Sequence, residues 1–583
     1  MCGFSGFLSG SDEGLGTEPN NDIMALLKQR GPDAQRALKF ENGVFYHARL
    51  AIQDPGVGAN QPFTAGDYVL VFNGEIYNHK RLRKEYSLQC QDDSDTATIA
   101  ALVKKRGAVS AIQCLEGMFA IAVFDRRTRE LTLARDPYGQ KPLYLNTNGD
   151  IVFSSVLSTF VQHFSTQLCD LDGQGISDYL ALGYGLGSRT ILKNVRRVLP
   201  GEVVKVSWDG KSYSVASQVN CLKPHNFSGQ EGGKIQETVD DCLLSDRGVG
   251  VLLSGGLDSS SVAAAMKNSG LKFTAYTLGF SDSSFDETHT AIRTAQTIGC
   301  DHKNFKYTAK EATEVFDNLS SMFDDPIADP SMIPTAVLMQ SISANDVVVL
   351  GGDGGDEQFG GYRRYKMARY AKKVLRVPYQ VRRVLIPILD FTLWRSQRVR
   401  ALYSSIGLGR PAENWGKFKA VMAARNLPEM ASALVCGSFY LKDIFRDITN
   451  DNLEKALIRF DLDHFLPNSV LMKVDRASMA FGVECRAPFL SGKWASMGGK
   501  EKDGKEGVKD FLKENDLSFL IKVPKTGFGS PPKFFDAVES YRSSVKSMHD
   551  SSLFKSLLDK YEVPSTEFRK VVLFKWLVHY EVI

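Results

Sequence analysis

Short apolar runs bounded by glycine and polar residues recur in the second half of the chain. Val249 to Leu253, Phe273 to Leu278 and Val347 to Leu350 each have the length of a strand buried on both faces. A run of small residues that ends at Gly270 separates the first two and predicts a short helix. The order strand, helix, strand predicts a βαβ unit and hence an α/β domain.

The first part of the chain has a different pattern, in which alternating or apolar runs such as Tyr68 to Phe72 and Met118 to Phe124 predict strands. Residues 209 to 234 are rich in Ser, Gly and Asn and have no periodicity, so a domain boundary is predicted there. We therefore expect a first domain over residues 1–207, a linker over 208–234 and a second domain over 235–583.

Composition narrows the possible classes of function only modestly. A chain of 583 residues, 43% hydrophobic and 24% charged, is long enough for two or three domains. Its net charge of +4 comes from 71 basic and 67 acidic side chains, so no nucleic-acid partner is expected. The nine cysteines form no CxxC pair, which argues against a zinc site and a disulfide framework. Because no signal peptide or membrane-length apolar run occurs, we expect a cytoplasmic protein with no transmembrane segment.

The turn after the first buried run carries the clearest chemistry. Its sequence is Ser254-Gly255-Gly256-Leu257-Asp258-Ser259-Ser260. Glycines, hydroxyls and backbone N–H groups at the positive end of the predicted helix together form a phosphate cradle, although the run is neither a Walker loop nor a GxGxxG motif. The Asp258 carboxylate would repel phosphates unless a cation lay between them, so the turn also predicts Mg²⁺. The alternative is an ordinary Gly-rich turn, which the six-residue run from Ser254 to Ser259 disfavours.

Cys2 becomes the N-terminal residue if the initiator Met is removed, and it would then carry both a thiol and a free α-amine. Because an α-amine has a pKa of about 8, its neutral fraction could take the thiol proton. One residue would supply both nucleophile and base, as in N-terminal-nucleophile enzymes. A cysteine at position 2 is weak support on its own, so the interpretation depends on the motifs that follow it.

Those motifs appear in a fixed order. They are Arg30-Gly31-Pro32-Asp33, His47-Ala48-Arg49-Leu50-Ala51-Ile52, Asn60-Gln61-Pro62, Asn73-Gly74-Glu75-Ile76-Tyr77-Asn78 and Ser94-Asp95-Thr96. With them, the first domain resembles the class II glutamine amidotransferase domain. The Ser254 to Ser259 run resembles the pyrophosphate loop of ATP pyrophosphatases. Lys473 to Ala480 and Glu484 to Leu490 match a C-terminal signature. Over nearly its whole length, the chain resembles the glutamine-dependent asparagine synthetase family.

The resemblance implies roles for residues of the first domain. Cys2 would attack the side-chain amide of glutamine, and the Asn73 side chain with the Gly74 N–H would form the oxyanion hole. A guanidinium would bind the glutamine α-carboxylate, and two carboxylates would hold its ammonium end. These glutamine-binding residues would be Arg49, Glu75 and Asp95.

In the second domain the resemblance implies an ATP site and a proton acceptor. Asp258 and Asp356 would be the Mg²⁺ ligands. Asp353 stands where many family members have a glutamate, which is proposed to accept a proton when ammonia attacks, and its side chain is one methylene shorter. The residues expected to bind ATP are Leu253, Ser254, Gly255, Gly256, Asp258, Ser259, Ser260, Leu278, Gly351, Gly352 and Lys509.

The resemblance also implies the fold, the reaction and the partners. The first domain would be an α+β N-terminal-nucleophile αββα sandwich, and the second an α/β ATP-pyrophosphatase domain with a helical C-terminal part. Glutamine would be hydrolysed and its ammonia passed internally to the second site. There ATP would adenylate a carboxylate, most simply that of the aspartate side chain, and ammonia would displace AMP to leave asparagine. The family suggests a homodimer.

The acceptor half of the chain departs most from the family pattern. Asp353 replaces Glu, and Ser491 replaces the Asp that usually ends the C-terminal signature. Residues Arg363 to Arg400 hold twelve Lys or Arg against the single acid Asp390. This basic stretch is either a solvated helical face or a patch for an anionic partner.

These departures leave other functions open. One alternative acceptor is a uronic-acid carboxylate, amidated during surface-polysaccharide assembly on a nucleotide or lipid carrier. A β-lactam-synthetase-like cyclase would need no working glutaminase, so the intact first site argues against it. A non-catalytic glutamine sensor would lose phosphate chemistry, and the intact Asp258 and Asp356 argue against that.

Overall fold

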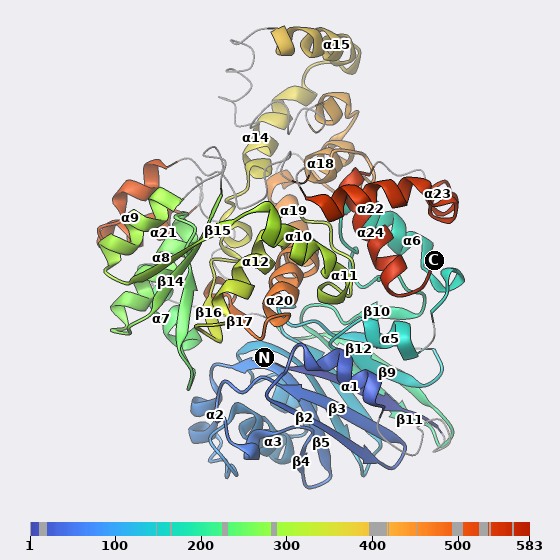
Figure 1. Cartoon of the computed structure of the whole chain (residues 1–583), viewed down its shortest axis with the longest axis vertical. Coiled ribbons are helices and arrows are strands. Elements are labelled where there is room, and N and C mark those ends of the chain that lie inside the picture. Colours follow the sequence, from blue (N-terminus) through green and yellow to red (C-terminus); the bar gives the residue numbers. More distant parts are fainter. Residues whose placement is uncertain are drawn as a thin grey trace.

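The computed structural model of the chain (Figure 1) describes residues 2–10, 20–146, 148–163, 166–223, 231–280, 288–395, 417, 419–449, 452–491, 505–523, 535, 538–561 and 565–583. The N-terminal part, blue to teal in Figure 1, is built from long antiparallel strands. The rest of the chain packs above it as helices around a smaller sheet.

Two six-stranded antiparallel sheets form the first domain, with strand orders β10-β8-β9-β1-β3-β2 and β12-β11-β7-β6-β5-β4. The first sheet consists of β1 (Gly3–Leu8), β2 (Ala34–Phe40), β3 (Gly43–Arg49), β8 (Tyr144–Asn146), β9 (Ile151–Ser154) and β10 (Val195–Arg197). The second consists of β4 (Phe63–Ala65), β5 (Tyr68–Ile76), β6 (Gly117–Asp125), β7 (Glu130–Arg135), β11 (Glu202–Trp208) and β12 (Tyr213–Asn220). The two strands predicted from apolar runs are β5 and β6.

The two sheets pack face to face through an apolar core that includes Phe4, Phe45 and Phe124. Helix α1 (Asn21–Lys28) covers the outer face of the first sheet and α3 (Asp95–Arg106) that of the second. Further helices of this domain are α2 (His79–Glu85), α4 (Ala108–Ile112), α5 (Ser158–His163) and α6 (Gly173–Leu182). The layers therefore follow the order helix, sheet, sheet, helix.

The first domain extends beyond its predicted end at residue 207. Strand β12 pairs with β11 from Tyr213 to Asn220, so the predicted linker, 208–234, contains an edge strand of the sheet. Tyr213 is its only buried side chain, and its exposed side chains are small or polar except for Val219. A strand that contacts the core at one end has little need of alternating apolar residues, which explains why the sequence pattern missed it. We propose that the domain boundary lies after Asn220.

A five-stranded parallel sheet, in the order β15-β14-β13-β16-β17, forms the centre of the second domain. Its strands are β13 (Val249–Leu252), β14 (Thr274–Phe280), β15 (Asp301–Tyr307), β16 (Val348–Leu350) and β17 (Glu484–Arg486). Helix α8 (Leu257–Asn268) joins β13 to β14, which confirms the predicted βαβ unit. The chain moves outward from β13 to β15 and later adds β16 and β17 on the other side. The loops after β13 and β16 therefore meet at a topological switch point, where open α/β sheets bind ligands.

Helices cover both faces of this sheet. One face packs on α7 (Glu231–Cys242), α8, α9 (Thr288–Ile298) and α21 (Glu506–Glu514). The other packs on α10 (Ala309–Asp317), α12 (Met332–Ile342) and α20 (Leu471–Met479). The last described helices, α22 (Glu539–Asp550), α23 (Ser552–Leu558) and α24 (Glu567–His579), extend the same core. The predicted α/β domain with a helical C-terminal part is therefore confirmed.

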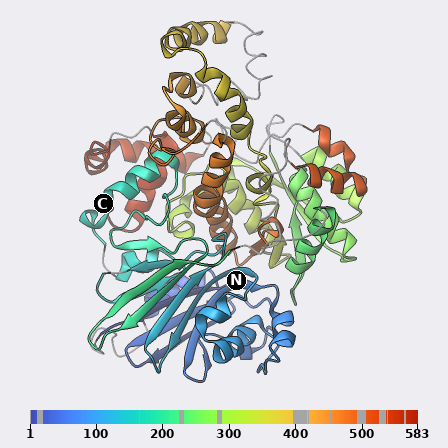
Figure 2. The ribbon, with the colours of Figure 1, turned by 180° about the vertical axis from the view of Figure 1, so that it is seen from behind.

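A helical arm projects from the second domain on the side opposite the first domain (Figures 1 and 2). It consists of α14 (Arg363–Leu375) and α15 (Tyr379–Arg395), and α18 (Leu427–Cys436) and α19 (Leu453–Phe460) lie at its base. The basic stretch noted in the sequence forms this arm, except for residues 396–400, which lie outside the described part. Among the described residues, no helix is both long and apolar enough to cross a membrane.

Buried ion pairs join the two domains. Arg30 donates to both carboxylate oxygens of Asp475, over 2.8 and 2.9 Å, and holds the pKa of that carboxyl below its ordinary value. Arg197 Nε donates to Asp325 Oδ2 over 3.0 Å. Because breaking a buried pair leaves an uncompensated charge, these contacts hold the domains in one relative orientation.

Two candidate active sites

Cys2 lies just before β1 and against the buried strand β5. Its backbone N–H donates to Asn73 Oδ1 over 3.0 Å. The Asn73 side chain is fully buried, and its Nδ2 has no hydrogen-bond partner among the described residues. An unpaired buried donor is costly, so its presence points to an acceptor supplied by a ligand. The predicted nucleophile and the predicted oxyanion donor are therefore neighbours.

Gly74 is required at its position by the packing of β5 on β6. Its φ is +150°, and a Cβ atom there would lie 2.0 Å from the carbonyl oxygen of Met118. No other residue fits so close an approach. This steric requirement holds whatever part the Gly74 N–H plays in catalysis.

Burial controls the protonation of Cys2. It raises the pKa of the Cys2 thiol, and the Leu50 backbone and the Arg49 charge lower it by smaller amounts. A thiol with a raised pKa stays protonated near neutral pH, whereas the thiolate is the nucleophile. A base is therefore needed, which fits the predicted use of the cysteine's own α-amine.

The other predicted residues of the first site gather around a cavity of about 30 Å³ beside Cys2. Its lining includes Arg49, Gly74, Glu75 and Asp95, whereas Asn73 contacts Cys2 without lining it. This volume is about the share of one water molecule in the liquid. Glutamine therefore needs more room than this conformation offers.

Arg49 explains why the cavity is small. Its Nη1 donates to the Gly56 carbonyl over 2.7 Å and to Asn60 Oδ1 over 2.9 Å. Its Nη2 donates to the carbonyls of Gln53 and Asp54 over 3.2 and 2.6 Å. The terminal N–H groups predicted to bind the glutamine carboxylate thus hold the loop over residues 53–60. Both terminal nitrogens of Arg49 are therefore already engaged by this loop.

Two carboxylates line the same cavity. Glu75 Oε2 accepts from Arg486 Nη2 over 3.0 Å, and Asp95 Oδ2 accepts from the Ile76 N–H over 3.1 Å. Burial raises the pKa of Glu75 well above its ordinary value, although the Arg486 charge lowers it, and burial raises the pKa of Asp95 to about 6. Buried carboxylates of this kind favour a cationic ligand such as an ammonium group.

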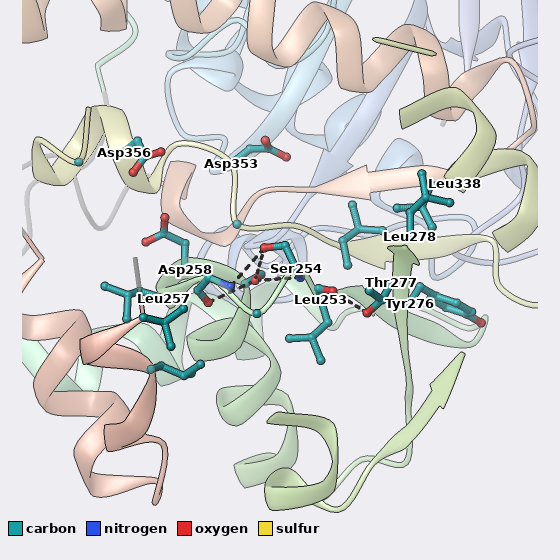
Figure 3. Close-up of a pocket in the computed structure, with 18 of the residues that line it drawn as sticks. Leu253, Ser254, Leu257, Asp258, Tyr276, Thr277, Leu278, Leu338, Asp353 and Asp356 are labelled. Atoms are coloured by element: carbon teal, nitrogen blue, oxygen red, sulfur yellow. Dashed lines mark hydrogen bonds between the residues drawn. The ribbon is translucent and has the colours of Figure 1, made fainter. Parts of the chain in front are cut away.

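The second site is a larger pocket of about 630 Å³ at the ends of β13, β14 and β16. Figure 3 shows Asp258, Asp353 and Asp356 on one side of this pocket and Leu278 and Leu338 on the other. The predicted ATP-binding residues that line it are Leu253, Ser254, Gly255, Gly256, Asp258, Ser259, Leu278, Gly352 and Lys509. Ser260 and Gly351 do not. Ser260 is buried in α8, and Gly351 packs beside Cys485.

Hydrogen bonds and close backbone packing hold the loop from Ser254 to Ser259 in place. The two hydroxyl oxygens of Ser254 and Ser259 are 3.0 Å apart, and the Gly256 N–H donates to Ser254 Oγ over 3.4 Å. Gly255 has φ +77°, and a Cβ there would lie 2.9 Å from Thr290 Cβ. A Cβ on Gly352 would lie 2.9 Å from the Ser259 backbone nitrogen, so the loops after β13 and β16 touch. Helix α8 begins within this run, at Leu257, which places its positive end at the pocket.

Lys505, which the sequence did not single out, lies between the two predicted metal ligands. Its Nζ is 2.6 Å from Asp356 Oδ1 and also forms a short ion pair with Asp258. The two carboxylates therefore stand close enough to share one cation. Within the described part of the chain there is no cluster of three or more metal-ligating side chains. Two carboxylates nevertheless fit Mg²⁺, which binds proteins through one or two of them and completes its shell with phosphates and water.

Asp353 lines the pocket on the loop after β16. Burial raises the pKa of Asp353, and the nearby Lys473 charge lowers it. Lys473 Nζ also contacts Asp329 Oδ2 over 3.0 Å and Ser331 Oγ over 2.7 Å. Lys473 belongs to a motif that the sequence did single out, so a signal for it existed. For Lys505 no sequence signal sets it apart from Lys500 or Lys502.

Strand β17 connects the two sites. Arg486 contacts Glu75 of the first site. A Cβ on Gly351 would lie 3.5 Å from Cys485 Sγ, and the Asp353 charge contributes to the raised pKa of that thiol. Because neighbouring side chains of a strand point to opposite faces, Arg486 is directed to one site and Cys485 to the other.

Comparisons with known proteins agree with this two-site organisation. A family model described as "Glutamine amidotransferase domain" matches residues 1–216, and one described as "Asparagine synthase" matches residues 233–494. "Asparagine synthetase [glutamine-hydrolyzing] 1" of Bacillus subtilis (strain 168) is 27% identical over 517 residues, which cover 84% of this chain and 79% of that protein. A "Putative asparagine synthetase [glutamine-hydrolyzing]" of Mycobacterium tuberculosis (strain ATCC 25618 / H37Rv) is 28% identical over 533 residues, which cover 84% of this chain and 80% of that protein. "Asparagine synthetase [glutamine-hydrolyzing]" of Mus musculus is 28% identical over 431 residues, which cover 69% of this chain and 73% of that protein.

Proposed function

Since the chain belongs to the glutamine-dependent asparagine synthetase family and is a glutamine-hydrolysing amidotransferase ligase, we propose that it converts aspartate, glutamine and ATP to asparagine, glutamate, AMP and pyrophosphate. The observation that carries this proposal is that β17 reaches both sites. Arg486 donates to Glu75 of the first site, and Cys485 is near Asp353 of the second, because a Cβ on Gly351 would lie 3.5 Å from Cys485 Sγ and 3.0 Å from Asp353 Oδ2. Ammonia that reaches water becomes ammonium and loses its lone pair, so a ligase of this kind needs its two sites joined within the protein.

At the first site we assign Cys2 the role of nucleophile. Its thiol gives its proton to its own α-amine, and the thiolate attacks the amide carbon of glutamine. The amide nitrogen takes this proton from the α-ammonium group and leaves as ammonia, and water then releases glutamate from the thioester. The amide oxygen gains negative charge during the attack. Asn73 Nδ2, with no partner among the described residues, and the Gly74 N–H would donate to it.

At the second site the acceptor carboxylate attacks the α-phosphorus of ATP, and pyrophosphate leaves. Ammonia then attacks the acyl carbon of the resulting anhydride, AMP leaves with the bridging oxygen, and the nitrogen loses a proton. We assign that proton to Asp353, because burial raises the pKa of its carboxyl and brings it nearer to the working pH. Adenylation is needed because a carboxylate is a poor electrophile.

Asp258 and Asp356 would hold Mg²⁺ at this site. When bound, the ion neutralises phosphate charge and orients the leaving pyrophosphate. Lys505 and Lys509 line the same pocket and are the cations we assign to the phosphates. The loop N–H groups from Ser254 to Ser259 add further donors at the start of α8.

The choice of aspartate is tested with purified protein, ATP, Mg²⁺ and an ammonium salt, with aspartate supplied or withheld, by following pyrophosphate. Pyrophosphate that requires aspartate and matches the asparagine formed would support the proposal. A site that hydrogen-bonds its substrate can discriminate by a factor on the order of 10⁴. No response to aspartate, from protein that still hydrolyses glutamine, would exclude it as acceptor.

A uronic-acid carboxylate on a nucleotide or lipid carrier is the second candidate acceptor. It is favoured by Asp353 and Ser491, the two departures from the family pattern, and by the basic arm. The chemistry at Cys2 and at ATP would be unchanged, and only the pocket around the acceptor would differ. In the same assay, uronate-dependent pyrophosphate without an aspartate response would select this candidate.

A further inference from the structure

Exposed aliphatic side chains are concentrated on the projecting arm. Twelve large hydrophobic residues are strongly exposed among the described residues, and five of them fall between Val377 and Ile388. Isolated exposed hydrophobics are ordinary, whereas a contiguous group marks a contact surface. On α15 the exposed fractions are 48% for Val381, 63% for Val384, 37% for Leu385 and 51% for Ile388. Their spacing of i, i+3, i+4 and i+7 places them on one face of the helix, here called the α15 face.

Arg382 determines which way this face points. It is 2% exposed, and its Nη1 donates to the carbonyls of Met422 and Ala424, each over 2.7 Å. Its Nε donates to the Val377 carbonyl over 2.9 Å. These three bonds fix the rotation of α15 about its axis, with Arg382 turned toward Met422 and Ala424. Val381 and Val384 are roughly a quarter turn and half a turn away from Arg382, so the α15 face is held toward solvent.

The arm that carries the α15 face is rich in positive charge. Arg376, at the end of α14, and Arg383, on α15, are both exposed, and Arg425 packs its guanidinium 5.5 Å from the centre of the Tyr379 ring. From Arg363 to Arg400 the sequence holds twelve basic residues against the single acid Asp390. Basic residues are thus concentrated in this stretch, while the chain as a whole is almost balanced at +4.

We propose that the α15 face binds the surface of an anionic membrane, with the aliphatic side chains among the lipid head groups and the exposed Arg376 and Arg383 attracted to the negative charge of that surface. A helix that joins an apolar stripe to flanking basic residues has the composition of an interfacial helix that lies in the plane of the membrane. The arm projects away from the first domain (Figures 1 and 2), so this contact leaves the glutamine site uncovered. The proposal does not depend on the identity of the acceptor.

Vesicle co-sedimentation of the full chain tests the proposal. Vesicles of phosphatidylcholine alone are compared with vesicles in which about half of the lipid is phosphatidylglycerol. The chain should bind the anionic vesicles and not the neutral ones, and raising the salt from about 0.1 M to about 0.5 M should remove most of the binding. Val381→Ser with Val384→Ser, and separately Arg376→Gln with Arg383→Gln, should each weaken binding by about tenfold or more.

A matched control is available elsewhere on the surface. Leu553→Ser with Val578→Ser removes two aliphatic side chains exposed by 47% and 48% on α23 and α24, and it should leave vesicle binding unchanged. Unchanged helix content and glutaminase activity would show that the arm variants are folded. Absence of binding by the wild type, or binding that survives both arm variants, would overturn the proposal. Self-association that disappears in the valine variant would instead assign the α15 face to a second copy of the chain.

Discussion

Arg486 Nη2 lies 3.0 Å from Glu75 Oε2, in a buried ion pair that joins the two domains. The Arg486 guanidinium is fully buried and also donates to Glu484 Oε1 over 2.6 Å and to the carbonyls of Cys242 and Leu244 over 2.8 and 2.7 Å. Every nitrogen of the group therefore has an acceptor. A carboxylate assigned to glutamine is thus held by a strand of the ATP-binding domain.

Glu75→Gln should raise the KM for glutamine by roughly 10- to 100-fold, because a hydrogen bond to a charged group contributes about 1.5–3 kcal/mol. Arg486 keeps Glu484 as a partner, so ammonia-dependent synthesis should change little. Steady-state kinetics with each nitrogen source separate the two effects. An equal loss with glutamine and with ammonia would show that Glu75 acts on the whole fold and not on glutamine.

Asn73→Ala should lower kcat for glutamine hydrolysis by about 10²–10³-fold, the usual effect of removing one oxyanion donor. Asn78→Ala is the matched control, because that side chain is similarly buried and donates to the Cys114 carbonyl over 2.9 Å outside the cavity. The control should retain most of its hydrolysis. Similar losses in both variants would indicate a structural role for Asn73.

Some strands of both domains could be predicted from local patterns. The runs that became β13, β14 and β16 are apolar because parallel strands are buried on both faces, and that signal is strong. Strand β12 was missed because an edge strand with polar exposed side chains resembles a loop in sequence. The layer order needed the resemblance to a family, because strand periodicity alone does not say which faces pack together.

The sites were predictable where their residues are adjacent in sequence and less so where they are not. The turn from Ser254 to Ser259 carries its chemistry in six consecutive residues. The contacts of Lys505 with Asp258 and Asp356 join positions 247 and 149 residues apart, so they follow only from the fold. The loop held by Arg49 was equally invisible, because its acceptors are mostly backbone carbonyls, which every residue has.

Lys505→Met should abolish ATP-dependent pyrophosphate release while glutaminase activity remains. Without the ammonium group, Asp258 and Asp356 face each other as like charges in a partly buried site. Lys509→Met, at another lysine that lines the pocket, is the comparison and should retain more activity, because Lys505 is the lysine whose Nζ pairs with both carboxylates. Normal pyrophosphate release by Lys505→Met would remove Lys505 from the site.

His79 should make stability depend on pH. Its ring is fully buried, neither nitrogen has a hydrogen-bond partner among the described residues, and burial lowers its pKa to about 4. Because the unfolded value is about 6.5, the neutral ring contributes stability above that pH and loses it as pH falls toward 4.

His79→Leu removes this dependence with little change in volume. The free energy of unfolding of the wild type, relative to that of the variant, should fall by about 2 kcal/mol between pH 8 and pH 5. Urea titrations at the two pH values measure this difference. A difference that stays constant with pH would mean that His79 is accessible to protons in the folded chain.

The central claim is that nitrogen released from glutamine at Cys2 is used at the ATP site. The most direct measurement supplies glutamine labelled with heavy nitrogen in its side-chain amide, together with aspartate, ATP, Mg²⁺ and unlabelled ammonium, and determines the label in the product by mass spectrometry. We predict asparagine whose side-chain amide carries the label, formed together with an equal amount of AMP. Glutamine hydrolysis that leaves no label in asparagine under these conditions would contradict the account.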